Sequence, residues 1–130
     1  MKISIEHIAL WTQDLDRSRA FYRKYFGAES NKKYINPGKG LETYFLTFTG
    51  GGPRLELMKR PEVTDAHRPD FIRGYAHVAF SLGSKEKVDA LTARLVEDGY
   101  HKLDGPRTTG DGYYEATFHD PDGNTIELTV

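Results

Sequence analysis

The sequence predicts an α+β fold in which two tandem βαβββ modules form curved mixed sheets. The first observation is an internal repeat, because EHIAL at residues 6–10 recurs as AHVAF at 76–80, and RLEL at 54–57 recurs as TIEL at 125–128. The second is a matching order of apolar patterns: each half has segments that alternate with a period of two and one longer segment with a helical period. Two units that match in order indicate a duplicated supersecondary module.

In the first half, a strand over residues 6–10 leads through a polar turn into a helix. Asp14 or Asp16 is expected to cap this helix, which runs through Phe26 and stops at Gly27. Gly50–Pro53 is expected to form a turn between two of the strands that follow. Those strands are predicted near Glu29–Asn36, Leu41–Thr49 and Arg54–Lys59.

In the second half, Tyr75–Leu82 alternates between an apolar face and a face that carries His77. Ser84 is expected to cap a helix over Lys85–Asp98, and Gly99 is expected to end it. The apolar stripe of this helix consists of Val88, Leu91 and Leu95. The last strands are predicted near Tyr100–Arg107, Tyr113–His119 and Asn124–Val130, with Asp120–Gly123 as a tight turn before the last one.

The length of 130 residues suits a single domain. We expect repeat 1 at about residues 1–59, a connector at 60–73 and repeat 2 at about 74–130. The connector contains two prolines and many charged residues. The repeats are therefore expected to be two half-domains of one fold.

Composition excludes several classes of partner. Lys plus Arg total 18 and Asp plus Glu total 19, so the net charge of −1 gives no basic excess for a nucleic acid. The apolar runs are too short to span a membrane, and the N-terminus has no signal-peptide pattern, so a cytoplasmic location is expected. Because the chain has no cysteine, any metal must be bound by histidine and carboxylate.

Four polar side chains share one position relative to the strands. His7, Glu56, His77 and Glu127 each lie opposite neighbouring apolar residues that are suited to meet a helix. With each helix on the convex side of its sheet, all four enter the concave cleft between the halves. Clustered carboxylates repel each other unless a cation neutralises them. Two imidazoles and two carboxylates suit nickel, zinc, cobalt, manganese or iron better than calcium, and leave room for substrate oxygens.

Each residue also has a plainer interpretation. A single strand glutamate or histidine is more often exposed or structural than a metal ligand, and only the repetition of both residue types makes coincidence a poor explanation for the set. His67, His101 and His119 have no repeat partners. We interpret His67 as part of the connector surface, His101 as an exposed strand residue and His119 as a surface residue beside the turn.

Several motifs resemble the vicinal oxygen chelate superfamily, which includes glyoxalases, dioxygenases and bleomycin resistance proteins. The similarity covers essentially the whole chain and rests on EHIALW with His7, RLELM with Glu56, YAHVAF with His77 and DPDGNTIEL with Glu127. The stretch GPRTTGDGYYEATFHDPDGN is similar to bacterial members of the lactoylglutathione lyase type.

Within that superfamily, a His/Glu/His/Glu set resembles glyoxalase I. Dioxygenases and fosfomycin-resistance enzymes typically lack an acidic residue matching Glu56. Methylmalonyl-CoA epimerase, another member of the superfamily, usually has glutamine there. The resemblance implies a lyase that converts the hemithioacetal of a 2-oxoaldehyde and a thiol into a 2-hydroxyacyl thioester by proton transfer. It further implies Glu127 as the principal base, Glu56 as its partner, one divalent metal ion and a homodimer.

The likeness has one departure. Bacterial glyoxalase I enzymes usually have arginine four residues after the first metal histidine, where this chain has Trp11, and Arg60 stands four residues after Glu56. The expected substrate pocket is more aromatic and includes Trp11, Phe45, Arg60 and Tyr113. The sequence leaves open the thiol, the metal, and whether sites form within one chain or across a domain-exchanged dimer. It also leaves open another enzyme of the superfamily, an epimerase or dioxygenase, and a non-enzymatic protein that binds small molecules or antibiotics.

Overall fold

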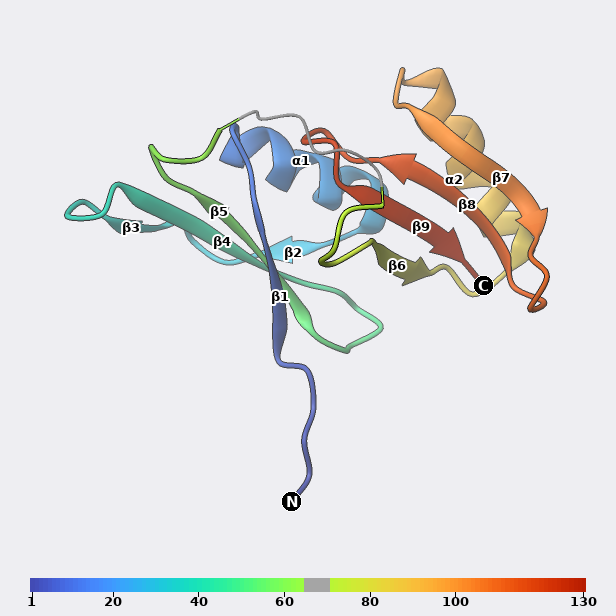
Figure 1. Ribbon diagram of the computed structural model, residues 1–130, viewed down its shortest axis with the longest axis horizontal. Helices are drawn as coiled ribbons and strands as arrows, with labels where there is room; N and C mark the ends of the chain where they lie inside the picture. Colours follow the sequence, from blue (N-terminus) through green and yellow to red (C-terminus); the bar gives the residue numbers. More distant parts are fainter. Residues whose placement is uncertain (65–70) are drawn as a thin grey trace. The chain divides into compact units, whose positions relative to one another are not determined.

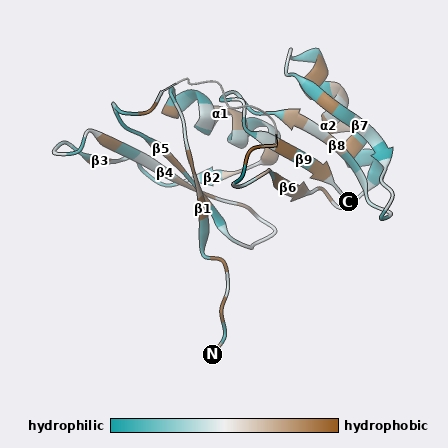
Figure 2. Cartoon of the chain, in the orientation of Figure 1, coloured by the Kyte–Doolittle hydropathy of each residue, from teal (hydrophilic) through white to brown (hydrophobic). Residues whose placement is uncertain are grey.

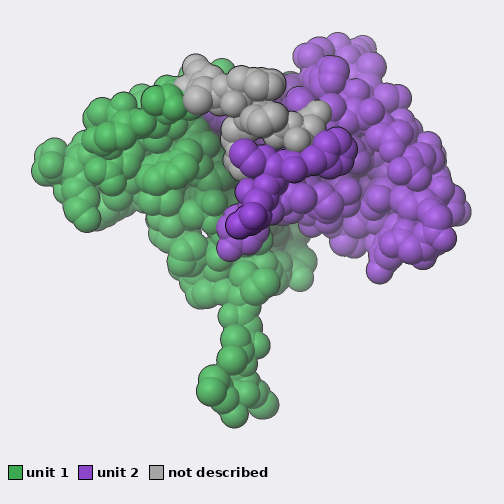
Figure 3. Space-filling model, in the orientation of Figure 1, with its two compact units in different colours: residues 1–67 green, residues 68–130 purple. Residues whose placement is uncertain are grey.

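The computed structural model describes residues 1–64 and 71–130, which form two β-sheets with one helix each (Figure 1). The predicted α+β fold is thereby confirmed. His67 and the middle of the predicted connector lie outside the described residues. The chain divides into two compact units, Met1–His67 and Arg68–Val130 (Figure 3), and each is described by itself.

The first unit contains a mixed sheet in the order β1-β5-β4-β2, with β3 also paired to β4. The parallel pair is β1 with β5, and the other neighbours are antiparallel. Its elements are β1 (His7–Trp11), α1 (Leu15–Phe26), β2 (Glu29–Ser30), β3 (Tyr34–Asn36), β4 (Leu41–Thr47) and β5 (Arg54–Lys59).

The second unit repeats this connectivity in the order β6-β9-β8-β7. Its first strand again lies parallel to its last strand, and the remaining neighbours are antiparallel. Its elements are β6 (Val78–Ser81), α2 (Lys85–Glu97), β7 (Lys102–Thr108), β8 (Tyr114–His119) and β9 (Thr125–Thr129). Both units therefore follow the predicted strand–helix–strand order.

Local signals at the helix ends explain where both helices start and stop. The Asp14 carboxylate accepts a hydrogen bond from the Arg17 backbone N–H at 3.0 Å, so Asp14 rather than Asp16 is the N-cap of α1. Such a cap stabilises a helix by about 1 kcal/mol. Gly27 ends α1 in the left-handed conformation with φ 63°. Ser84 caps α2 by accepting from the Lys87 N–H at 3.2 Å.

Alternation along the strands separates a helix-covered face from the opposite face. Leu55 and Leu57 of β5, like Ile126 and Leu128 of β9, are buried, and the helix of each unit packs against these strands. In Figure 2, brown apolar residues run along β6 and β9. The apolar stripe predicted for α2 is buried as well and consists of Val88, Leu91 and Leu95. The residues between the buried ones, including the two candidate glutamates, project from the face away from the helix.

Two predicted strands differ from the observed ones. The segment predicted as one strand near Glu29–Asn36 forms two short strands, because the Asn31 side chain accepts the Phe45 backbone N–H at 2.8 Å and interrupts the regular ladder. The strand predicted over Tyr75–Leu82 is limited to Val78–Ser81, where it pairs with β9. His77 therefore immediately precedes β6.

The turn before β9 is built around a buried carboxylate. Asp120 is 4% exposed and accepts hydrogen bonds from the backbone N–H groups of Asp122 and Asn124, both at 2.9 Å. The Asn124 side-chain amide adds a third at 3.0 Å, and Gly123 closes the turn with φ 81°. The predicted tight turn is confirmed. In the part of the chain that the structure describes, neither helix is long and apolar enough to cross a membrane.

Candidate metal centre

In the first unit, the parallel pairing of β1 and β5 brings His7 beside Glu56. Ala9 is the register partner of Glu56, and His7 stands two residues earlier on the same face of β1. Nε2 of His7 lies 3.7 Å from Oε1 of Glu56. The Glu56 side chain is 15% exposed and that of His7 is 42% exposed, so the carboxylate is largely covered and the imidazole remains accessible.

The second unit repeats the same arrangement with the same register. Ala79 is the register partner of Glu127, and His77 stands two residues before Ala79. Nε2 of His77 lies 3.2 Å from Oε1 of Glu127, whose side chain is 17% exposed. Each unit thus supplies one imidazole and one carboxylate from matching sequence positions, with the imidazole at or just before the first strand and the carboxylate on the last strand.

The environment of Glu127 favours its protonated form. Burial is the largest cause that raises the pKa of this carboxyl, and the neighbouring His77 opposes it. The Glu115 carboxyl on β8 raises the Glu127 pKa further through its charge and a hydrogen bond. A positive charge beside Glu127, such as that of a metal ion, would oppose both effects.

His7 is held by a network that has no counterpart around His77 among the described residues. Nδ1 of His7 donates to the Glu6 carboxylate, and the Arg54 guanidinium donates to the other oxygen of Glu6. The Arg54 guanidinium also lies 4.0 Å from the centre of the Phe45 ring, which meets the His7 ring edge-on at 5.4 Å. A carboxylate on the far nitrogen orients a ligating imidazole and raises its basicity.

Sequence reasoning missed this network. In the second unit the corresponding positions are occupied by Ala76, Thr125 and Thr117, which cannot reproduce it. The signal for Arg54 was available, since it precedes Glu56 by two residues and shares its face. Glu6 gave no such signal, because it lies before the regular strand and reaches His7 from its neighbouring position.

The donor atoms fit a divalent transition metal. Two imidazole nitrogens with two carboxylates form a mixed set that nickel, zinc, cobalt, manganese and iron accept. Among the described residues, no group of three or more His, Asp or Glu side chains is arranged to hold an ion. The four-ligand centre therefore remains a prediction.

The predicted substrate-binding residues have different surroundings. Trp11 shares the face of β1 that carries His7 and is 47% exposed, and Phe45 contacts the His7 ring. Arg60 follows β5 and forms an ion pair with Glu62. Tyr113 belongs to the second unit and is 58% exposed. Within the first unit, Trp11 and Phe45 therefore border the His7–Glu56 face.

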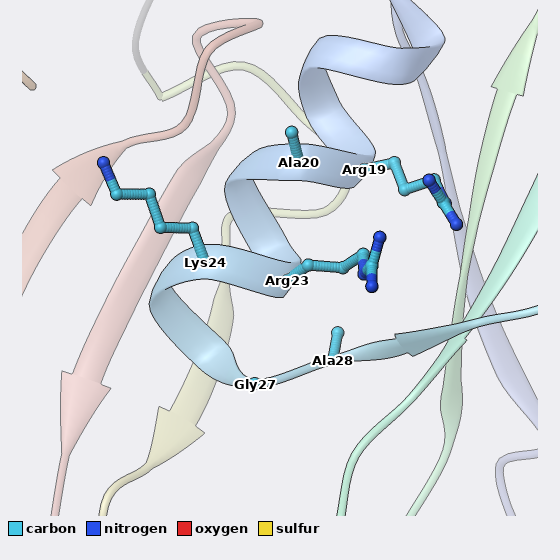
Figure 4. Close-up of a pocket in the computed structure, with 6 residues that line it drawn as sticks. All are labelled: Arg19, Ala20, Arg23, Lys24, Gly27 and Ala28. Atoms are coloured by element: carbon cyan, nitrogen blue, oxygen red, sulfur yellow. The ribbon is translucent and has the colours of Figure 1, made fainter.

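An open pocket at the C-terminal end of α1 is separate from these residues. It is lined by Arg19, Ala20, Arg23, Lys24, Gly27 and Ala28. Figure 4 shows Arg19 and Arg23 extending to one side of the helix and Lys24 to the other. Because α1 covers the apolar face of its sheet, this pocket lies away from the face that carries His7 and Glu56. Its cations complement the negative end of the helix dipole.

A sequence profile of the glyoxalase/bleomycin resistance protein/dioxygenase superfamily matches residues 4–128. Metallothiol transferase FosB of Lysinibacillus sphaericus is 31% identical over 125 residues, which cover 96% of this chain and 80% of that protein.

Solved structures show the same fold. A glyoxalase/bleomycin resistance protein/dioxygenase domain from Frankia sp. EAN1pec superposes with a TM-score of 0.84 at 18% identity, covering 100% of this chain and 98% of that one. The trypanothione-dependent glyoxalase I of Leishmania major superposes with a TM-score of 0.79 at 25% identity, covering 98% of this chain and 86% of that one.

Proposed function

Because the chain belongs to the glyoxalase/bleomycin resistance protein/dioxygenase superfamily, we propose that it is a metal-dependent lyase of the glyoxalase I type. Its substrate would be the hemithioacetal of a 2-oxoaldehyde and a thiol, and its product a 2-hydroxyacyl thioester. One observation carries this proposal: the same His–Glu pair, in the same register, occurs in both units. Two carboxylates allow one to transfer a proton while the other remains a ligand.

His7, Glu56, His77 and Glu127 would hold the ion, which is nickel, zinc, cobalt, manganese or iron. When bound, such an ion polarises the two neighbouring oxygens of the substrate. This makes the hydrogen on the carbon that carries the hydroxyl group and the sulfur more acidic. The Glu6 carboxylate keeps Nδ1 of His7 protonated and leaves Nε2 free to ligate.

Glu127 is assigned as the principal base. Its carboxylate takes the proton from the carbon that carries the thiol and returns it to the adjacent former carbonyl carbon. The hydroxyl proton moves between the two oxygens, so the product is an isomer of the substrate and no oxidant is needed. Burial of Glu127 supports this role, because a desolvated carboxylate is a stronger base than an exposed one. Glu56 is its counterpart in the first unit.

The thiol and the aldehyde side chain would contact the aromatic residues beside the first half-site, by which we mean the pair His7–Glu56; the second half-site is His77–Glu127. Trp11 and Phe45 share the His7 face, and we assign Arg60 and Tyr113 to the polar rim of the pocket. A homodimer is part of this proposal. The two units that complete one ligand set belong either to one chain or to two chains of the dimer.

The proposal is tested by metal analysis and a methylglyoxal assay with several thiols. The wild type should retain an ion at this centre and form thioester, while His77→Ala should lose that ion. Glu127→Gln should lower kcat by about 10²- to 10⁴-fold, as expected for removal of a general base. Glu29→Gln, at an exposed position on β2, is the control. Full activity of Glu127→Gln, or no turnover by the metal-loaded wild type with any thiol, would exclude the proposal.

The similarity to FosB supports a second candidate, metal-dependent transfer of a thiol to a small electrophile. This reaction forms a carbon–sulfur bond and opens a bond of the acceptor, such as an epoxide, with the thiol proton moving to the leaving oxygen. The two candidates differ in their products. Mass spectrometry distinguishes an isomer of the hemithioacetal from a stable thiol adduct of the electrophile.

A further inference from the structure

Two histidines outside the candidate centre lie side by side in the second unit. The pairing of Lys102 with Phe118 continues by one residue, so His101 stands directly opposite His119 on the antiparallel neighbour. The His119 backbone N–H donates to the His101 carbonyl at 3.0 Å, which fixes the spacing of the two backbones. The imidazole centroids lie 5.3 Å apart with their planes 29° from parallel.

We propose that the cross-strand pair His101–His119 is a second site for a divalent transition metal, with copper and nickel preferred. Paired residues in an antiparallel sheet project from the same face with their Cβ atoms about 5 Å apart. Two imidazoles on such a platform can approach one ion together. This site is independent of the proposed function.

The separation of the two imidazole rings is close to that of two rings bound to one metal ion. With metal–nitrogen bonds of about 2.0–2.1 Å, two imidazoles in neighbouring coordination positions have centroids roughly 4.5–5.2 Å apart. The observed separation of 5.3 Å is close to the upper end of that range. The rings are stacked, so each must turn about its Cβ–Cγ bond to direct a nitrogen at the ion. That torsion has a broad energy profile in histidine and opposes such a turn only weakly.

Both rings are available for binding. His101 is exposed and His119 is partly exposed. Among the described residues, the only side-chain interaction of either ring is with the other ring. The carboxylate of the adjacent Asp120 is committed to the turn, where it accepts three hydrogen bonds. Water would therefore complete the coordination sphere.

The ligand chemistry selects the metal. A site with two imidazoles and water lacks the carboxylates that manganese, magnesium and calcium prefer. For nitrogen ligands the affinity rises through nickel to copper and falls again at zinc. The pair is therefore expected to bind Cu²⁺ more tightly than Ni²⁺ or Zn²⁺.

The histidine pair lies on the same sheet face as Glu127, and an ion bound there affects how the metal content of the protein is interpreted. His119 pairs with Thr125, and Thr117 on the same face pairs with Glu127. A metal ion at the histidine pair would be counted together with an ion at the candidate centre. Metal analysis of the wild type alone would then overstate the content of the centre.

Isothermal titration of the metal-stripped full chain with Cu²⁺ tests the site, using His101→Asn and His119→Asn. Each substitution should weaken the additional Cu²⁺ site about tenfold or more, since losing one arm of a chelate removes the gain from bivalency. His77→Asn removes an imidazole from the candidate centre and is the matched control, which should keep the additional site. Circular dichroism checks that each variant is folded.

A second measurement uses NMR. In the His77→Asn variant, whose candidate centre lacks one imidazole, Cu²⁺ should broaden the imidazole NMR signals of His101 and His119 together. The proposal is overturned if only one of the two signals broadens, if either asparagine variant binds Cu²⁺ as the wild type does, or if His77→Asn also removes the additional site.

Discussion

At the scale of single residues, the two half-sites differ in how their histidines are held. His7 is oriented by the carboxylate of Glu6, which Arg54 holds in turn. His77 follows an alanine and has no carboxylate at the corresponding position. We infer that the first half-site is the more preorganised of the two, because its imidazole needs less ordering on metal binding.

Replacing Glu6 by glutamine tests this inference. The substitution keeps the size of the side chain but weakens the hydrogen bond to Nδ1 of His7, so the affinity for the metal should fall about tenfold, the low end for loss of an outer partner. Competition with a chromophoric chelator measures the affinity. Glu29→Gln is again the control, and equal affinities of the two variants would contradict the prediction.

Asp16 offers a residue-scale prediction for pH. It accepts hydrogen bonds from the Tyr44 hydroxyl at 2.7 Å and from Lys33 at 3.2 Å, and the Tyr44 bond is the largest cause that lowers the pKa of Asp16. Because the Asp16 side chain is 67% exposed, its replacement by asparagine should cost only about 0.5–1 kcal/mol at neutral pH.

The pH dependence of this difference follows from the lowered pKa. Stabilisation by a carboxyl with a depressed folded-state pKa is present above its unfolded-state value, near 3.8, and is lost as the pH falls through the folded-state value. Urea titrations of the wild type and Asp16→Asn should therefore converge in strongly acidic solution. A difference that persists or grows there would contradict the assignment.

At the scale of elements, the pairing of β7 with β8 depends on Gly105. This residue has φ 81°, and a Cβ added to it would stand 2.4 Å from the Glu115 carbonyl oxygen and 2.9 Å from the Ala116 Cα. Backbone atoms cannot move aside without disturbing the sheet. The contact and the left-handed conformation both exclude a side chain here.

Gly105→Ala is expected to lower the free energy of unfolding by about 2–4 kcal/mol, from overpacking and backbone conformation together. Gly112→Ala is the matched control, because Gly112 has φ 93° and open space around its Cβ position. It should cost only the conformational part, about 1–2 kcal/mol. Equal losses in thermal denaturation would mean that the contact with β8 contributes nothing.

The elements also show what the sequence could predict. Caps and apolar stripes located both helices, since these signals are local. Alternation assigned Glu56 and Glu127 to the face away from the helices for the same reason. The break between β2 and β3 was missed because it depends on the Asn31 side chain meeting β4, fourteen residues along the chain. A contact between distant segments produces no periodic sequence pattern in either segment.

At the scale of the whole molecule, the candidate ligands were predictable because duplication repeats them, whereas their supporting residues are not repeated. Within each unit, the pairing register of the first and last strands brings the histidine beside the glutamate. Whether the two His–Glu pairs meet depends on how the units associate. A sequence pattern within one unit does not encode that association. The assembly of the proposed four-ligand centre can be tested with pairs of variants.

Mixing two inactive variants distinguishes the possible assemblies. His7→Ala damages the first half-site and His77→Ala the second. If sites form between chains of a domain-exchanged dimer, a mixed dimer contains one site with both histidines intact, and mixing should restore up to about a quarter of the wild-type activity and metal content by random pairing. If sites form within a chain, refolding the variants together should restore neither. Each variant refolded alone is the control.

The position of the His–Glu pairs also bears on how the protein unfolds. In each unit the imidazole comes from the start of the first strand or the residue just before it, and the carboxylate comes from the last strand. A shared ion would therefore act as a cross-link between the two ends of that unit. A ligand that binds only the native state at a hundredfold excess over its Kd adds about 2.7 kcal/mol of stability. Amide hydrogen exchange along β1 and β6, which lie at the edges of their sheets, should consequently slow when metal is added.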